Sequence, residues 1–177
     1  MHSNNKRFLE DVKNQYPQYF TNVSVLEIGS VDYYGYIRSL FDAKEHIGVD
    51  ACEGYNYTAE QYKAYGVDIQ CYANQTQFTQ DQFDVFICLS VFEHDPTWKE
   101  TIQHNLQWLK PNALLIMSWG AEGNQHHGLN WLPVTTEEFH IFIKTLPIEV
   151  LDCYFEEDRY GLDSAGSYAF VGRYTAG

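Results

Sequence analysis

Short apolar runs alternate along the chain with segments whose apolar residues recur every three or four positions. The runs predict strands at residues 23–28, 46–50, 67–72, 83–89 and 113–119. The periodic segments predict helices at residues 5–16, 34–41, 58–65 and 95–110, and a further helix that Thr135 or Thr136 caps. The strands at 83–89 and 113–119 are almost wholly apolar, as strands buried on both faces of a parallel sheet are.

This alternation predicts an α/β fold, a Rossmann-like, doubly wound and mostly parallel seven-stranded sheet with helices on both faces. Two late strands, at 148–155 and 168–174, predict an antiparallel pair, so a C-terminal antiparallel strand completes the sheet. The length of 177 residues is that of a single domain, in which residues 1–20 carry an N-terminal helix and 23–177 form the core. Asp95 and Pro96 predict the start of the long helix, and Pro111 its end.

Charge and composition narrow the classes of partner. The formal net charge is −13 at pH 7, which repels phosphate backbones and anionic lipid, so we expect no nucleic acid and no membrane partner. No apolar stretch approaches the ~20 residues that span a bilayer, and the N-terminus does not read as a secretory signal. The four cysteines form no C-x-x-C pair, which favours reduced thiols and a cytoplasmic location. The sequence leaves monomer and homodimer open.

Asp50 is the most informative polar residue. It ends the second predicted strand, 21 positions after Gly29, which follows the first. Ligands of open α/β sheets bind at the carboxyl ends of the strands, where such an acid accepts hydrogen bonds from both hydroxyls of a ribose. The alternative is a solvated acid that merely ends a strand, but with the turn at Gly29 ribose binding is the stronger interpretation.

The loop after the first strand indicates which nucleoside binds. A dinucleotide site needs a G-x-G-x-x-G turn, and here only Gly29 fits, because Val31 and Tyr33 replace later glycines. Asp32 adds a negative charge where a phosphate would lie. The loop therefore opposes a pyrophosphate and favours a cationic nucleoside without phosphate, such as S-adenosylmethionine.

Four motifs in order carry a resemblance to a known family: Val-Leu-Glu-Ile-Gly-Ser at 25–30, Ile-Gly-Val-Asp at 47–50, residues 83–96, and residues 109–116. The chain resembles the class I S-adenosylmethionine-dependent methyltransferases, and is most similar to the small single-domain, type 11-like group that modifies small molecules or glycans. The resemblance implies S-adenosylmethionine as cofactor and a small-molecule or glycan-type acceptor.

The resemblance also implies site residues. It assigns Glu27 and Gly29 to the methionine half of the cofactor, Asp50 to the ribose, Tyr72 and Ala73 to the adenine, and the segment after the fourth strand to the methionine moiety. The full implied cofactor set is Glu27, Gly29, Ser30, Asp50, Ala51, Tyr72, Ala73, Ser90, Val91 and Glu93.

Methyl transfer is an in-line displacement that depends mostly on positioning. A general base is needed only when the acceptor is an alcohol, a phenol or a protonated amine. His94 and His127 follow the fourth and fifth strands and are the catalytic candidates, with a purely structural role as the alternative for each. No spacing of ligands predicts a metal site. Two other functions remain open, a non-catalytic binding module with the methyltransferase fold and, less favoured, a nicotinamide-dependent oxidoreductase.

Overall fold

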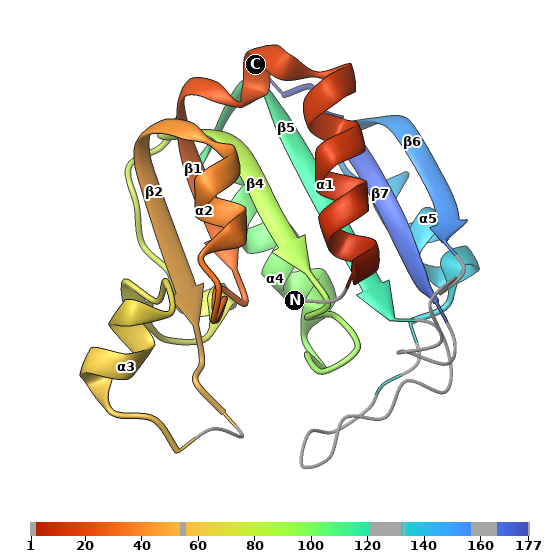
Figure 1. The fold of residues 1–177 in the computed structure, drawn as a ribbon. Helices are drawn as coiled ribbons and strands as arrows, with labels where there is room; N and C mark the ends of the chain where they lie inside the picture. Colours follow the sequence, from red (N-terminus) through yellow and green to blue (C-terminus); the bar gives the residue numbers. More distant parts are fainter. Residues whose placement is uncertain (1–2, 54–55, 121–131, 133, 157–165, 177) are drawn as a thin grey trace.

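The computed structural model describes residues 3–53, 56–120, 132, 134–156 and 166–176. Within these residues, seven strands form one mixed sheet in the order β3-β2-β1-β4-β5-β7-β6 (Figure 1). Their bounds are β1 Thr21–Ile28, β2 Asp42–Asp50, β3 Ile69–Gln70, β4 Phe83–Leu89, β5 Leu109–Gly120, β6 Ile148–Glu156 and β7 Ser167–Tyr174. Strands β1 to β5 are mutually parallel, and β7 runs antiparallel to both β5 and β6. The predicted α/β sheet and its antiparallel C-terminal strand are therefore confirmed.

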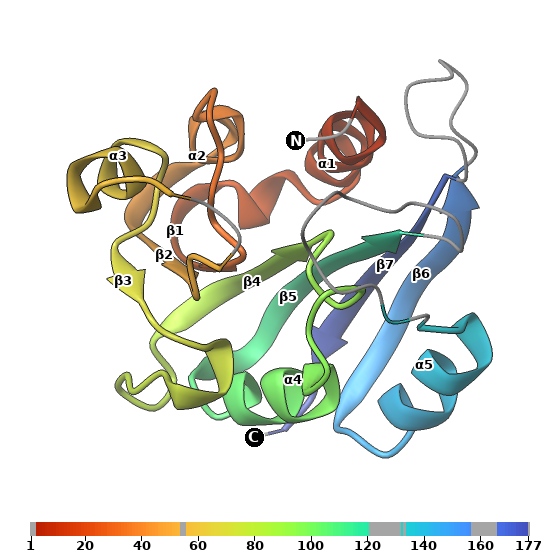
Figure 2. The ribbon, with the colours of Figure 1, turned by 90° about the horizontal axis from the view of Figure 1, so that it is seen from below.

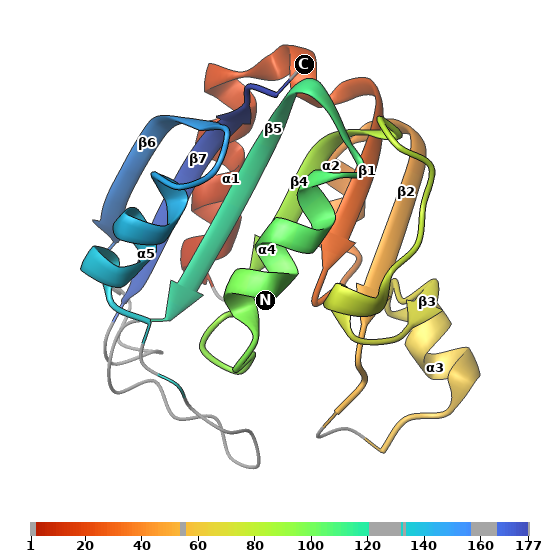
Figure 3. The ribbon, with the colours of Figure 1, turned by 180° about the vertical axis from the view of Figure 1, so that it is seen from behind.

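Helices cover both faces of this sheet, as Figures 2 and 3 show from two sides. On one face lie α1 (Ser3–Gln15), α2 (Tyr36–Leu40) and α3 (Ala59–Ala64), and on the other lie α4 (Trp98–Leu106) and α5 (Thr136–Ile143). Two short 3₁₀ helices, η1 (Pro17–Tyr19) and η2 (Ala73–Gln75), lie in the connections. No described helix is long and apolar enough to span a lipid bilayer.

The core has a separate apolar cluster on each face of the sheet. Leu26, Phe86 and Leu115 face the helices α4 and α5, whereas Val25 and Ile87 face α1 and α2. All five side chains are at most 1% exposed. Both faces of β4 are thus buried, which explains why the sequence of this strand shows no alternation of polar and apolar residues.

The long helix after β4 begins and ends differently from the prediction. It starts at Trp98, because the Asp95 carboxylate accepts hydrogen bonds from the backbone N–H of Thr97 (2.7 Å) and the hydroxyl of Thr101 (2.6 Å) and closes a turn before the helix. It ends at Leu106, and Pro111 lies inside β5, where the pairing with β4 is irregular. A proline is tolerated at such an irregular position because no ladder hydrogen bond requires its missing N–H.

The third strand is shorter than the predicted 67–72. Only Ile69 and Gln70 are in strand conformation, at the edge of the sheet beside β2. The N–H of the preceding Asp68 still donates to the carbonyl of Gly48 (2.8 Å), but the N–H of Gly48 donates to the Asp68 carboxylate (2.8 Å), which also accepts from the guanidinium of Arg38. These polar contacts compete with strand pairing and shorten β3.

Candidate functional site at the carboxyl edge of the sheet

The carboxyl ends of β1, β2, β4 and β5 meet along one edge of the sheet, which Figure 2 views from below. The sequence placed its candidate residues directly after these strands. The fold brings together the loop that begins at Gly29, the turn at Asp50 and the segment from Ser90 to His94 at this edge.

Gly29 occupies a position that only glycine fits. Its φ of +73° lies in the left-handed region, and a Cβ atom there would stand 2.1 Å from Cγ2 of Val91. Its N–H donates to the carbonyl of Val49 at the end of β2 (2.8 Å). Gly29 and Val91, which the sequence proposed separately, are therefore neighbours, and the loop after β1 packs directly on the segment after β4.

Glu27 has a partner that the sequence analysis missed. The side chain is 2% exposed, and its Oε2 lies 2.7 Å from Nε2 of His46 on the neighbouring strand β2. The other oxygen, Oε1, is buried without a hydrogen-bond partner. Burial raises the pKa of Glu27, while the hydrogen bond with His46 acts in the opposite direction. No local pattern marks His46, because the contact depends on the register between β1 and β2.

The next residues of the loop turn inward. Ser30 is 1% exposed and lies against Gly48, where a Cβ atom would come within 2.7 Å of the Ser30 Oγ. The Asp32 carboxylate is also buried and accepts hydrogen bonds from the backbone N–H groups of Tyr34 (3.1 Å) and Ile37 (2.9 Å). Asp32 thus fixes the turn that leads into α2, and it keeps a carboxylate beside the glycine turn.

Asp50 lies between the loops after β1 and β2. Its Oδ1 accepts a hydrogen bond from the backbone N–H of Cys52 (2.6 Å), and the backbone of Val31 donates to the same carboxylate. Burial raises the pKa of Asp50, and these two backbone hydrogen bonds act in the opposite direction. The half-buried Ala51 is part of the same turn. The carboxylate is therefore fixed at the strand tip.

The predicted adenine segment follows β3. Tyr72 is half exposed and its hydroxyl bonds to the carboxylate of Glu53, in the loop after Asp50. Ala73 begins η2 and packs against the core cluster beneath α4. The phenol of Tyr72 thus joins the loop after β3 to the loop after β2.

The segment after β4 contains a second buried carboxyl group. Glu93 is 1% exposed, its Oε1 accepts a hydrogen bond from the N–H of Gly120 (3.0 Å), and its Oε2 is buried without a partner. Its backbone carbonyl also accepts from the N–H of Leu132 (2.8 Å). Burial raises the pKa of Glu93 to about 7. Glu93 therefore joins the end of β5 to Leu132, with a carboxyl that is partly protonated near neutral pH.

The two catalytic candidates have different outcomes. His94 is half-buried in the turn between β4 and α4, and its backbone N–H donates to the carbonyl of Val91 (2.8 Å). His127 lies outside the described residues. Among the residues that the structure describes, no group of three or more His, Cys, Asp and Glu side chains is arranged to hold a metal ion.

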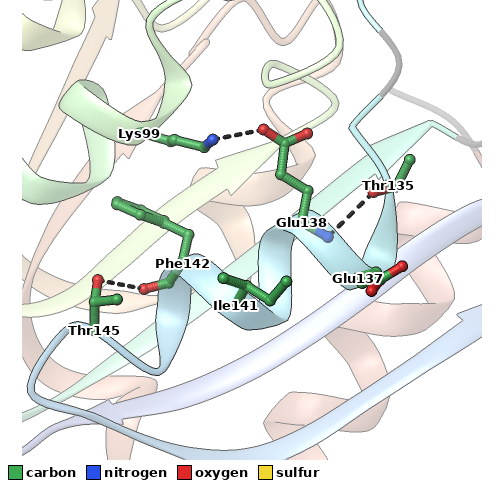
Figure 4. A pocket seen from close by; sticks show the side chains of 7 residues that line it. All are labelled: Lys99, Thr135, Glu137, Glu138, Ile141, Phe142 and Thr145. Atoms are coloured by element: carbon green, nitrogen blue, oxygen red, sulfur yellow. Dashed lines mark hydrogen bonds and ion pairs between the residues drawn. The ribbon is translucent and has the colours of Figure 1, made fainter.

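An open groove of about 390 Å³ lies elsewhere, between α4 and α5 (Figure 4). Lys99 and Glu138 form an ion pair of 2.5 Å across it, and Ile141 is 62% exposed along its wall. None of the candidate residues lines this groove. Its volume alone does not make it the reaction site, because the polar groups suited to a nucleoside lie at the carboxyl edge.

The groups at this edge fit S-adenosylmethionine. Gly29 lets the loop after β1 pack closely on Val91, the Asp50 carboxylate suits a ribose diol, and the buried Glu27 and Asp32 bring carboxyl groups to the edge where a cationic ligand would bind. We find no cradle of successive glycines for a pyrophosphate in this loop.

Comparison with known proteins agrees with this geometry. A family model described as a methyltransferase domain matches residues 1–146. A ubiquinone biosynthesis O-methyltransferase of Rickettsia canadensis is 25% identical over 167 residues, which cover 86% of this chain and 70% of that protein.

Two solved structures share the fold at low sequence identity. An S-adenosylmethionine-dependent methyltransferase from Mesorhizobium loti matches with a TM-score of 0.71 at 11% identity, over 93% of this chain and 96% of that chain. The 1,6-didemethyltoxoflavin-N1-methyltransferase of Burkholderia thailandensis, solved with 1,6-didemethyltoxoflavin and S-adenosylhomocysteine, matches with a TM-score of 0.71 at 12% identity, over 98% of this chain and 79% of that chain. The family model spans most of the chain, and the chain belongs to the methyltransferase domain family, with the class I fold that uses S-adenosylmethionine.

Proposed function

We propose that this enzyme transfers a methyl group from S-adenosylmethionine to a small-molecule or glycan-type acceptor at the carboxyl edge of the sheet. The observation that carries this proposal is the Asp50 carboxylate, fixed by the N–H of Cys52 beside the turn at Gly29. In this arrangement the Asp50 carboxylate accepts hydrogen bonds from the ribose hydroxyls, and the backbone after Gly29 lies along the methionine half of S-adenosylmethionine. Tyr72 and Ala73 border the adenine.

The charge of the edge supports this donor over a nicotinamide dinucleotide. Asp32 supplies a carboxylate in the loop after β1, and Glu27 in β1, Asp50 at the end of β2 and Glu93 after β4 add three carboxyl groups whose pKa values burial raises. A pyrophosphate brought to this edge would meet negative charge with no glycine-rich turn to offset it. A sulfonium and an ammonium group meet favourable charge there.

The donor, when bound, supplies an activated methyl group on a positively charged sulfur. The chain has to hold donor and acceptor in line and to exclude water, and such positioning contributes up to ~7–11 kcal/mol in favourable cases. If the acceptor is a hydroxyl group, its proton must leave, and we propose the imidazole of His94, in the turn after β4, as the group that accepts it. An oxygen acceptor has support from the Rickettsia relative, which is named an O-methyltransferase.

Isothermal titration calorimetry with S-adenosylhomocysteine tests the donor site. Asp50→Ala removes charge-assisted hydrogen bonds to the ribose and should weaken binding about tenfold or more, which corresponds to ~1.4 kcal/mol or more. Asp42→Ala is the matched control, because Asp42 is an exposed acid at the opposite end of the same strand. The control should bind as the wild type does.

An unchanged dissociation constant in Asp50→Ala would show that the ribose is held elsewhere. A parallel titration with NAD separates the two nucleotide classes. Binding of NAD without binding of S-adenosylhomocysteine would contradict the proposal and favour an oxidoreductase.

A further inference from the structure

Asn5 is a buried polar residue on a helix that otherwise packs through apolar side chains. It is 3% exposed, near the start of α1, whose residues Phe8, Leu9 and Val12 belong to the core cluster on that face of the sheet. A buried amide is costly unless its donors and its acceptor are paired. The partners of Asn5 therefore show what it contributes.

Both polar atoms of the Asn5 amide bond to serines at the carboxyl edge. Its Nδ2 donates to Oγ of Ser90 after β4 (3.0 Å), and its Oδ1 accepts from Oγ of Ser118 near the end of β5 (2.8 Å). The sequence separations are 85 and 113 residues. Figure 1 shows the first turns of α1 beside the ends of these strands. One side chain thus joins the N-terminal helix to two strand ends that border the donor site.

Ser90 needs such support. Its φ is +56°, in the left-handed region that a serine rarely adopts, and its N–H donates to the carbonyl of Ser118 (2.9 Å). A conformation of this kind persists only when its surroundings hold it, and it is often found at functional sites. The next residue, Val91, packs against Gly29. The turn at Ser90 and Val91 therefore sets how the segment after β4 meets the loop after β1.

We propose that Asn5 is a positioning residue for the methyl donor. The Asn5 amide holds Ser90 in its left-handed conformation, and this conformation places Val91 against Gly29 in the loop after β1. This inference rests on the proposed function, because it assumes that the donor binds between these two segments. It makes the N-terminal helix part of the donor site, although the helix precedes every motif that the sequence analysis used.

The test compares single and double variants by calorimetry with S-adenosylhomocysteine. Asn5→Leu keeps the size of the side chain but removes its hydrogen bonds to Ser90 and Ser118, and it should weaken binding about tenfold. Ser90→Ala should weaken binding similarly. If Asn5 acts through Ser90, the double variant should bind no more weakly than Ser90→Ala alone.

Lys13→Met is the matched control on the same helix. Lys13 Nζ donates to the carbonyl of Leu40 (2.6 Å) and thus anchors the far end of α1 to α2. Its loss also weakens the attachment of α1, yet binding of S-adenosylhomocysteine should stay at the wild-type value. Thermal melting of every variant shows that it folds.

Hydrogen exchange of the unliganded protein gives a second readout that needs no ligand. Asn5→Leu should speed exchange in the peptide that contains Ser90 and Val91, whereas Lys13→Met should not. Wild-type affinity in Asn5→Leu, additive losses in the double variant, or unchanged exchange would each overturn the inference. If the wild type itself binds no S-adenosylhomocysteine, the proposed function fails, and the exchange measurement alone decides whether Asn5 holds the turn.

Discussion

Replacing Glu93 by glutamine should remove a large pH dependence of stability. The carboxyl group is 1% exposed, and burial raises its pKa from 4.5 to about 7. In the unfolded chain the group ionises near 4.5, so between pH 4.5 and 7 the folded state holds a proton that the unfolded state has lost. The contribution of Glu93 to stability is therefore greatest below pH 4.5, falls as the pH rises toward 7, and is level above that.

The size of this effect follows from the two pKa values. A difference of about 2.5 units at 1.36 kcal/mol per unit amounts to ~3 kcal/mol between the two ends of the window. Glutamine keeps an oxygen that can accept the hydrogen bond from Gly120 but has no proton to lose. The Glu93→Gln variant should therefore become more stable relative to the wild type as the pH rises.

Urea unfolding followed by tryptophan fluorescence at pH 5, 6, 7 and 8 measures the difference directly. The free energy of unfolding of the variant minus that of the wild type should increase by about 2–3 kcal/mol from pH 5 to pH 8. Contributions of the other titrating groups cancel in this difference. Glu137→Gln, at an exposed acid on α5, is the control for the loss of one charge. A difference that stays constant over this range would refute the reasoning, because Glu93 would then ionise alike in both states.

Two further predictions concern packing and charge. Gly29→Ala should lower the free energy of unfolding by more than Gly35→Ala does. Both glycines have positive φ, and an alanine in that conformation costs ~1–2 kcal/mol at either position. Only at Gly29 would the new Cβ atom also clash with Val91, at 2.1 Å. Urea unfolding of both variants tests this, and adding Val91→Ala should restore part of the Gly29→Ala loss; equal losses at the two glycines would contradict the packing. Lys99→Met should change stability by less than ~1 kcal/mol, because its ion pair with Glu138 is more than 40% exposed on both sides. A larger loss in thermal or urea unfolding would show that the groove between α4 and α5 depends on that pair.

Local patterns predicted the elements best where burial alone determines the sequence. The predicted strand at 83–89 coincides with β4, and Thr135, one of two predicted caps, accepts the hydrogen bond from the N–H of Glu138 that begins α5. Prediction was poorer where side chains replace regular backbone pairing. Asp95 looks like a helix cap in sequence, but its carboxylate reaches Thr97 and Thr101 and delays the helix by one turn.

The partners of the site residues could not be read from the sequence. His46 meets Glu27 across two strands, and Asn5 meets serines 85 and 113 positions away, so no short-range spacing marks either residue. Both are polar residues in otherwise apolar surroundings, and such residues are buried only when a partner exists. Asn5 lies in a polar run at residues 3–7, so nothing in the sequence distinguishes it from its polar neighbours.

The bulky residues that replace later glycines in the first loop are explained by where they pack. Val31 packs against the cluster of Cys52, Tyr62 and Val67, on the α3 side of the loop, and Tyr33 lies edge-on to Tyr65 with ring centroids 5.0 Å apart. These side chains fill space between the loop and α3, so they leave the contact between Gly29 and Val91 unaffected. A glycine is needed where the backbone has positive φ and meets Val91, and residue 29 is that glycine. The altered motif is therefore compatible with a donor that carries no pyrophosphate, because such a donor requires no run of free N–H groups.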